Sequence, residues 1–310
     1  MAGSNKIKIK DKVRKHRLCY MNREIPLGVG CATLGRGKTT VAEDVDLMLA
    51  CYEKGFRYFD SSRAYGESEV SLGEFIKQVP RDSLYIATKS PCPNWNFEIF
   101  KRNFYESFER LQTDYIDVFQ IHDTDNFGRC EAHIVPFLEA RREEGLIGYI
   151  GMGTRSLNAH ENGVACGVVQ SCLSYLNYNI QNKAAANLSA VCKKYGAAFV
   201  NASVFNYGML SMDNLLDFSD NPDGSTKRRR IITHEVKKLC AAMGISIFDA
   251  AIQMSLLNPD IDMTLIGVSR IEYLESTLKS LEAVIYPEQW ARILELQDSF
   301  PLMYIQDNLY

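Results

Sequence analysis

Short apolar runs alternate with longer amphipathic stretches along most of this chain. The stretches carry apolar positions at the three- and four-residue spacing of helices, and the runs have the length of strands. Short apolar runs joined by helices cannot form hairpins, so the pattern predicts a parallel sheet. The predicted strands are 27–34, 56–60, 84–89, 115–121, 146–151, 168–173, 197–202 and 263–267. The predicted helices are 41–54, 68–78, 97–111, 131–144, 157–165, 182–195, 231–243, 246–257 and one from about 271.

This order of strands and helices predicts an α/β fold, a closed (β/α)8 TIM barrel. No linker-like change in composition divides the chain, so we expect one domain over residues 1–310. Residues 1–17 read as a flexible tail leading into a short N-terminal hairpin. Residues 211–230 break the rhythm with Asp, Asn, Pro, Gly and a basic run, which predicts a long loop at the active face, either a solvated excursion or a lid. The tail 284–310 carries aromatic residues that either cover the pocket or pack on the outside of the barrel.

Composition narrows the possible classes of protein. Hydrophobic residues make up 46% of the chain and charged residues 24%, which is typical of a globular domain. The formal net charge of -3 gives no reason to expect nucleic acid as a partner. The nine cysteines are scattered without metal-ligand spacing, so we read them as reduced thiols and expect no metal. No apolar run has the length to cross a bilayer and no secretory signal is visible, so we expect a cytoplasmic protein.

Four polar side chains follow successive predicted strands. Asp60 and Tyr65 lie in YFDSSRAYGESE, Lys89 lies in LYIATKS, and His122 lies in YIDVFQIHD. In a parallel barrel the carboxyl ends of the strands form the active face, so these side chains should share one pocket. Each one alone has an ordinary structural explanation, as a helix cap, a packed ring, an exposed amine or a satisfied imidazole. Four of them at successive strand ends favour chemistry.

The four groups suit proton transfer at an oxygen. An unperturbed phenol has a pKa near ~10, and a nearby ammonium lowers it. Tyr65 is therefore the predicted proton donor, Lys89 the group that tunes it, and Asp60 the anchor of Lys89. His122 can orient a carbonyl oxygen. The set contains no source of electrons, so a redox reaction requires a hydride carrier.

The segments around these residues resemble three signatures of the aldo-keto reductases, in the same order. They are FRYFDSSRAYGESEVSLGEFI, LYIATKS and SFERLQTDYIDVFQIHD, and the likeness runs from about residue 25 to about residue 283. The likeness is strongest to the branch that contains L-galactose dehydrogenase and the aldose 1-dehydrogenases, on ERLQTDYIDVFQIHD, IVPFLEARREEGLIGYIGMG and ASVFNYGMLS. The resemblance implies a catalytic tetrad of Asp60, Tyr65, Lys89 and His122, a nicotinamide coenzyme, and a sugar or other small carbonyl compound as substrate.

The resemblance also implies where NADP or NAD would lie. A glycine lets the chain pass close to phosphates, and a helix start offers free amides to an anion. A simple glycine turn that begins the last helix is the alternative. The implied coenzyme residues are Thr154, Gln170, Ser203, Phe205, Gly208, Met209, Gly267, Val268, Ser269, Arg270 and Tyr273. Ser276 and Thr277 replace the family's usual adenine contacts, so the choice between the two coenzymes stays open.

Arg63, Trp95 and Asp123 are the predicted substrate-facing residues, because they lie beside the predicted tetrad or follow the third strand. Trp95 offers an aromatic wall for a sugar ring, or it packs as an ordinary core residue. Two other functions remain open. One is a coenzyme-binding regulatory barrel without significant turnover, and the other is a lyase in which Lys89 forms a Schiff base. We expect a monomer or a small homo-oligomer.

Overall fold

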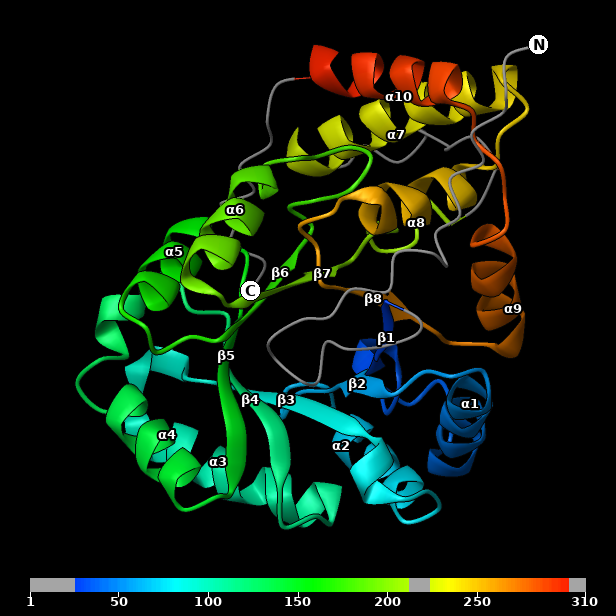
Figure 1. The fold of residues 1–310 in the computed structure, drawn as a ribbon. Helices are drawn as coiled ribbons and strands as arrows, with labels where there is room; N and C mark the ends of the chain where they lie inside the picture. Colours follow the sequence, from blue (N-terminus) through cyan, green and yellow to red (C-terminus); the bar gives the residue numbers. More distant parts are fainter. Residues whose placement is uncertain (1–25, 212–223, 301–310) are drawn as a thin grey trace.

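Eight parallel strands close into a barrel in their order along the chain, with β1 beside β8. The computed structural model describes residues 26–211 and 224–300. Figure 1 shows the strands at the centre and the helices outside them. The strands are β1 (Leu27–Gly30), β2 (Tyr58–Asp60), β3 (Tyr85–Pro91), β4 (Ile116–His122), β5 (Ile147–Gly153), β6 (Ser171–Tyr175), β7 (Ala198–Ala202) and β8 (Met263–Gly267). The predicted (β/α)8 TIM barrel is confirmed.

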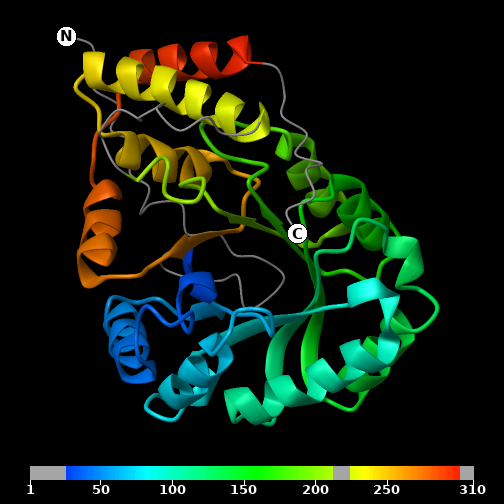
Figure 2. The same cartoon turned by 180° about the vertical axis from the view of Figure 1, so that it is seen from behind.

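The helices surround the strands, and α7 and α10 lie side by side outside α8 in both opposite views (Figures 1 and 2). The α-helices are α1 (Val41–Glu53), α2 (Ser68–Ile76), α3 (Phe97–Leu111), α4 (Ile134–Glu143), α5 (Leu157–Ala165), α6 (Ala186–Tyr195), α7 (Gly224–Ala242), α8 (Ile247–Leu257), α9 (Ile271–Ser280) and α10 (Pro287–Ser299). Short 3-10 turns are η3 (Cys31–Thr33), η4 (Arg81–Ser83), η5 (Pro93–Trp95) and η6 (Phe127–Arg129). Within the described ranges no single helix is long and apolar enough to cross a membrane; the bent pair Arg229–Ala242 and Ile247–Leu257 passes that test only together.

Two predicted irregular segments are partly helical. The loop predicted to run to residue 230 has ended by Gly224, where α7 begins. The Lys and Arg residues at 227–230 are good helix formers, but a run of charged residues lacks the apolar spacing that would have marked the start of α7. In the tail predicted from residue 284, α10 starts at Pro287 and places Trp290 and Ile293 three residues apart on its buried side. The predicted N-terminal tail and hairpin lie outside the described residues.

Three buried clusters hold the layers together. A small cluster fills the barrel, where Gly28 leaves room for neighbouring side chains: a Cβ there would lie 2.7 Å from Leu265 Cδ2 and 2.9 Å from Tyr58 Cδ1. A larger cluster lies mainly between the strands and helices α1 to α6. The third joins α7, α8 and α10 into an outer layer. Burial of these apolar side chains is the main favourable contribution to the fold.

The loops after β1 and β2 are fixed to each other at the carboxyl ends of these strands. Gly35 adopts φ 67°, and a Cβ on it would lie 2.1 Å from the Ser68 nitrogen, so this backbone contact requires glycine. The buried Asp44 accepts hydrogen bonds from Gly35 N at 2.9 Å and Ser71 Oγ at 2.8 Å. Ser68 Oγ donates to Cys31 O at 2.9 Å. These contacts anchor the start of α2, which follows the loop that carries Tyr65, to the loop after β1 and to α1.

Candidate active site

The four predicted catalytic side chains meet at the carboxyl ends of three neighbouring strands. Asp60 ends β2, His122 ends β4, and Lys89 lies two residues before the end of β3. Tyr65 lies in the loop that leads from β2 into α2. The Lys89 Nζ lies 4.9 Å from the centre of the Tyr65 ring, and the rings of Tyr65 and His122 are 5.8 Å apart at 88°. Sequence reasoning predicted this convergence.

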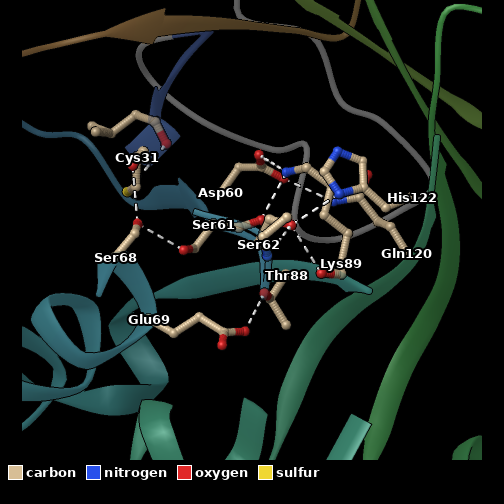
Figure 3. A network of polar contacts seen from close by, with 12 residues as sticks. Cys31, Asp60, Ser61, Ser62, Ser68, Glu69, Thr88, Lys89, Gln120 and His122 are labelled. Atoms are coloured by element: carbon tan, nitrogen blue, oxygen red, sulfur yellow. Dashed lines mark hydrogen bonds and ion pairs between the residues drawn. The ribbon is translucent and has the colours of Figure 1, made fainter. Parts of the chain in front are cut away.

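A buried ion pair lies at the base of the site. Lys89 and Asp60 are only 1% and 3% exposed, and Lys89 Nζ donates to Asp60 Oδ1 (Figure 3). Lys89 Nζ also donates to Ser61 O at 2.7 Å, and Gln120 Nε2 donates to Asp60 Oδ2 at 2.8 Å. A buried ion pair is tolerated when further hydrogen bonds satisfy both partners. This arrangement fixes the position of the ammonium beside Tyr65.

The pKa of Tyr65 is shifted in the direction opposite to the expectation that Lys89 lowers it. Burial raises the pKa of the phenol, and the Lys89 ammonium lowers it by less. Asp60 and Asp123 add to the rise in pKa. Tyr65 therefore keeps its proton at neutral pH, which suits donation to a developing alkoxide.

Lys89 and His122 are shifted in opposite directions. Burial lowers the pKa of Lys89, but the carboxylate of Asp60 and the phenol of Tyr65 outweigh it and the pKa is raised. Burial lowers the pKa of His122 to about 4, although Asp123 acts to raise it. At neutral pH the site thus holds an ammonium and a neutral imidazole.

Sequence reasoning missed several polar neighbours of this group. Gln120 bonds Asp60, Ser62 Oγ lies 2.9 Å from His122 Nδ1, and the guanidinium of Arg36 lies 5.4 Å from the centre of the Tyr65 ring. Gln120 carried a detectable signal, because it stands two residues before His122 in a strand and so shares its face. Ser62 and Arg36 lie outside the strands, where no periodicity identifies them.

The three predicted substrate residues make different contacts in the structure. The guanidinium of Arg63 bonds Glu106 of α3 at 2.6 Å, and a contact of Arg63 with the substrate stays a prediction. Trp95 adopts φ 58° and is partly buried, with the Arg129 guanidinium 5.0 Å from its ring centre. Asp123, at φ 52°, accepts from Tyr175 Oη at 2.6 Å. Asp123 is the predicted substrate residue that directly contacts the tetrad group, with Oδ2 3.4 Å from His122 Nε2.

The two coenzyme residues predicted around β5 and β6 are constrained. Thr154 is buried, and its hydroxyl donates to Thr124 O at 2.7 Å. Gln170 precedes β6, and its side-chain oxygen accepts from Ile150 N and from Arg142 of α4, each at 3.2 Å. The carboxyl end of β6 is Tyr175 instead. Gln170 was predicted inside the strand 168–173, but β6 starts at Ser171, so Gln170 lies at the amino end of the strand, opposite the predicted tetrad; its predicted contact with the coenzyme is therefore wrong.

The turn after β7 contains four predicted coenzyme residues. Ser203 and Gly208 have φ of 60° and 85°, so the chain reverses sharply there. Phe205 stacks on Phe248 of α8 with ring centres 4.4 Å apart, and Met209 Sδ lies 4.0 Å from Thr233 Oγ1. The turn is therefore held against the outer helices.

The β8 end and the start of α9 carry the other five. Gly267 is exposed, with nothing within 4 Å of where a Cβ would lie, and Arg270 precedes α9 without a side-chain cap. Open backbone at a helix start suits a phosphate. Arg270 and Tyr273 are exposed and Ser269 is half-buried, whereas the Val268 side chain is buried and only its backbone is available.

A second buried imidazole supports the site from α5. His160 Nε2 lies 3.0 Å from Thr154 O, and burial lowers the pKa of His160 to about 4.

The lowered pKa of His160 makes the stability of the fold depend on pH. A depressed folded-state pKa contributes stability above the unfolded value near ~6.5, and this contribution is lost as the pH falls toward 4. We expect His160→Gln, which retains a donor for Thr154, to reduce the loss of unfolding free energy between pH 7 and pH 5 by about 2 kcal/mol. Urea denaturation of both proteins at the two pH values measures this; equal losses would contradict it.

Comparison with known proteins identifies the family of this chain. The model of the aldo/keto reductase family matches residues 26–298. The L-galactose dehydrogenase of Arabidopsis thaliana is 28% identical over 272 residues, 82% of this chain and 83% of that protein. The D-threo-aldose 1-dehydrogenase of a Pseudomonas species is 26% identical over 87% of this chain and 93% of its own. Among solved structures, an aldo-keto reductase from Bacillus halodurans superposes with a TM-score of 0.72 at 21% identity, over 87% of this chain and 91% of that one. The family match spans the whole barrel with its buried Lys89–Asp60 pair, and the chain belongs to the aldo/keto reductase family.

Proposed function

We propose that this protein is an NAD(P)-dependent oxidoreductase that interconverts an aldehyde, ketone or sugar with the corresponding alcohol or lactone. The convergence of Tyr65, Lys89 and His122 around the buried Asp60 carboxylate carries the proposal. Family membership supports an oxidoreductase that acts on carbonyl compounds.

Each residue has a defined task in this reaction. His122 donates a hydrogen bond that positions the substrate oxygen, and Tyr65 donates its proton to that oxygen as it becomes an alcohol. Lys89 stabilises the phenolate left on Tyr65, because its ammonium lies 4.9 Å from the ring centre and stays charged beside Asp60. In oxidation the same proton returns to Tyr65. A bound nicotinamide coenzyme supplies or accepts the hydride.

The open start of α9 fits the phosphate end of such a coenzyme. Gly267 leaves space beside the chain, and the first amides of α9 have no side-chain cap. Arg270 is exposed there and can pair with a 2′-phosphate, which makes NADP as acceptable as NAD. Ser203 and Gly208 lie in the turn after β7 that we assign to the pyrophosphate.

A hydroxylated substrate suits the polar wall of the pocket. Asp123 is 17% exposed, accepts from Tyr175, and lies beside His122. A carboxylate at this position can also accept from a hydroxyl next to the reacting carbon. Relatives named L-galactose dehydrogenase and D-threo-aldose 1-dehydrogenase support a sugar as the substrate.

A panel of aldoses and simple carbonyl compounds, assayed with NAD and NADP in both directions, tests the proposal. We expect a change in reduced-nicotinamide absorbance with at least one sugar, and faster oxidation as the pH rises, because the raised pKa of Tyr65 disfavours the phenolate. Coenzyme binding without turnover on the whole panel would favour the regulatory alternative. A Schiff base on Lys89 has little support, because its amine is charged and held by Asp60.

A further inference from the structure

We propose that Ser62 is a positioning residue that holds His122 in the tautomer with its proton on Nε2. Nε2 is the ring nitrogen nearest Asp123, and Nδ1 is the one nearest Ser62. The catalytic meaning of this inference rests on the proposed function, but the tautomer itself does not depend on it.

Ser62 is buried and has one proton to donate. Its Oγ lies 2.9 Å from His122 Nδ1 and 3.1 Å from Lys89 O, and it accepts a hydrogen bond from Ala64 N at 3.1 Å (Figure 3). If the hydroxyl donates to Nδ1, the imidazole proton must be on Nε2. If it donates to Lys89 O, Nδ1 must carry the proton to make its contact with Ser62. The two arrangements therefore correspond to the two tautomers.

The first arrangement satisfies more groups. Lys89 O already accepts from Arg63 N at 3.0 Å, so it does not need the serine proton. His122 Nδ1 is buried and has Ser62 as its hydrogen-bonding neighbour. A buried polar atom without a partner costs more than a second bond to a satisfied carbonyl gains.

Asp123 favours the same tautomer from the other side of the ring. Its Oδ2 lies 3.4 Å from His122 Nε2, and a carboxylate can only accept. An unprotonated Nε2 would set its lone pair against that charge. Asp123 cannot turn away freely, because its backbone N donates to Gly153 O at 2.8 Å and its Oδ1 accepts from Tyr175 at 2.6 Å.

The consequence is a neutral imidazole with a donor on Nε2. Burial lowers the pKa of His122 to about 4, so one nitrogen carries no proton at neutral pH. A carbonyl oxygen needs a donor, and only the Nε2-protonated form supplies one on the side away from Ser62. Loss of the serine hydroxyl removes the partner of Nδ1 and lets the other tautomer form.

Ring ¹⁵N chemical shifts of His122 test this directly. The chain has five histidines, and His122→Asn identifies the signals of this one. We expect Nδ1 to be pyridine-like and Nε2 pyrrole-like in the unmodified protein. Ser62→Ala should shift both signals toward each other and lower kcat about tenfold with a smaller change in KM, and Ser62→Thr should restore both. Ser71→Ala is the matched control, because it removes another buried serine that bonds Asp44 of α1.

Two results would overturn the inference. One is a pyrrole-like Nδ1 in the unmodified protein, and the other is Ser62→Ala with the same His122 shifts as Ser71→Ala. Both readouts are independent of turnover, so a protein inactive on every substrate would refute the proposed function and still decide the tautomer.

Discussion

Tyr65→Phe is expected to lower kcat about 10³-fold while coenzyme affinity stays nearly unchanged. The phenol is the group that we assign to proton transfer, and a positioned acid contributes on the order of 10²–10⁴-fold. Phenylalanine keeps the ring that packs against Lys89 and His122, so the pocket retains its shape. Coenzyme titration by fluorescence and steady-state assays with the most active sugar measure the two quantities.

Tyr52→Phe serves as the control for Tyr65→Phe. Tyr52 lies on α1, away from the candidate site, and its hydroxyl lies 3.0 Å from Ser83 Oγ. Tyr52→Phe removes one phenol hydroxyl without changing the pocket, so the activity of this variant should match that of the unmodified protein. Full activity of Tyr65→Phe would remove the mechanism.

Lys89→Met is expected to abolish turnover and to destabilise the fold by about 3–5 kcal/mol, since it leaves the Asp60 carboxylate buried without its counter-ion. Asp60 is 3% exposed, and its remaining side-chain donor is Gln120. Burial raises the pKa of Asp60 above its ordinary value. Lys89 opposes this rise in the unmodified protein, so Lys89→Met should raise the pKa of Asp60 further. A raised pKa favours the folded state below the unfolded value and this contribution is lost as the pH rises, so the deficit of Lys89→Met should shrink on acidification.

The double variant Asp60→Asn/Lys89→Met separates loss of the pair from loss of one partner. Without a carboxylate to strand, it should be less destabilised than the sum of the two single variants. Urea denaturation at pH 7 and pH 5 gives the free energies of unfolding. A deficit below about 1 kcal/mol for Lys89→Met would mean that the ion pair contributes no more than a surface pair.

The barrel and the convergence of Asp60, Tyr65, Lys89 and His122 were predictable from the sequence. Strand and helix periods differ, and eight alternations leave few topologies. The carboxyl-end rule then places the polar residues that follow successive strands together. Periodicity worked less well where charge masked it: the basic run before Ile231 concealed the start of α7, and α10 was read as an irregular tail.

The directions of individual side chains were not predictable. Arg63 lies two residues before Tyr65, yet its guanidinium reaches Glu106 because the loop turns it toward α3. The prediction for Gln170 failed because β6 starts three residues after the apolar run 168–173 begins, which leaves Gln170 at the amino end of the strand. The pKa of Tyr65 depended on the balance between burial and the Lys89 charge, and burial cannot be obtained from spacing.

The side chains assigned to proton transfer and those assigned to the coenzyme lie on different parts of the barrel. Strands β2 to β4 and the loop after β2 carry every side chain that we assign to proton transfer. Lys89 bonds Asp60, and Ser61 Oγ of the loop lies 2.8 Å from Ser68 Oγ at the start of α2. The turn after β7 is braced by Phe248 and the outer layer of α7, α8 and α10. Because we propose that the turn after β7 holds the coenzyme, we expect substitutions in that outer layer to change coenzyme affinity while leaving the proposed proton donor Tyr65 in place.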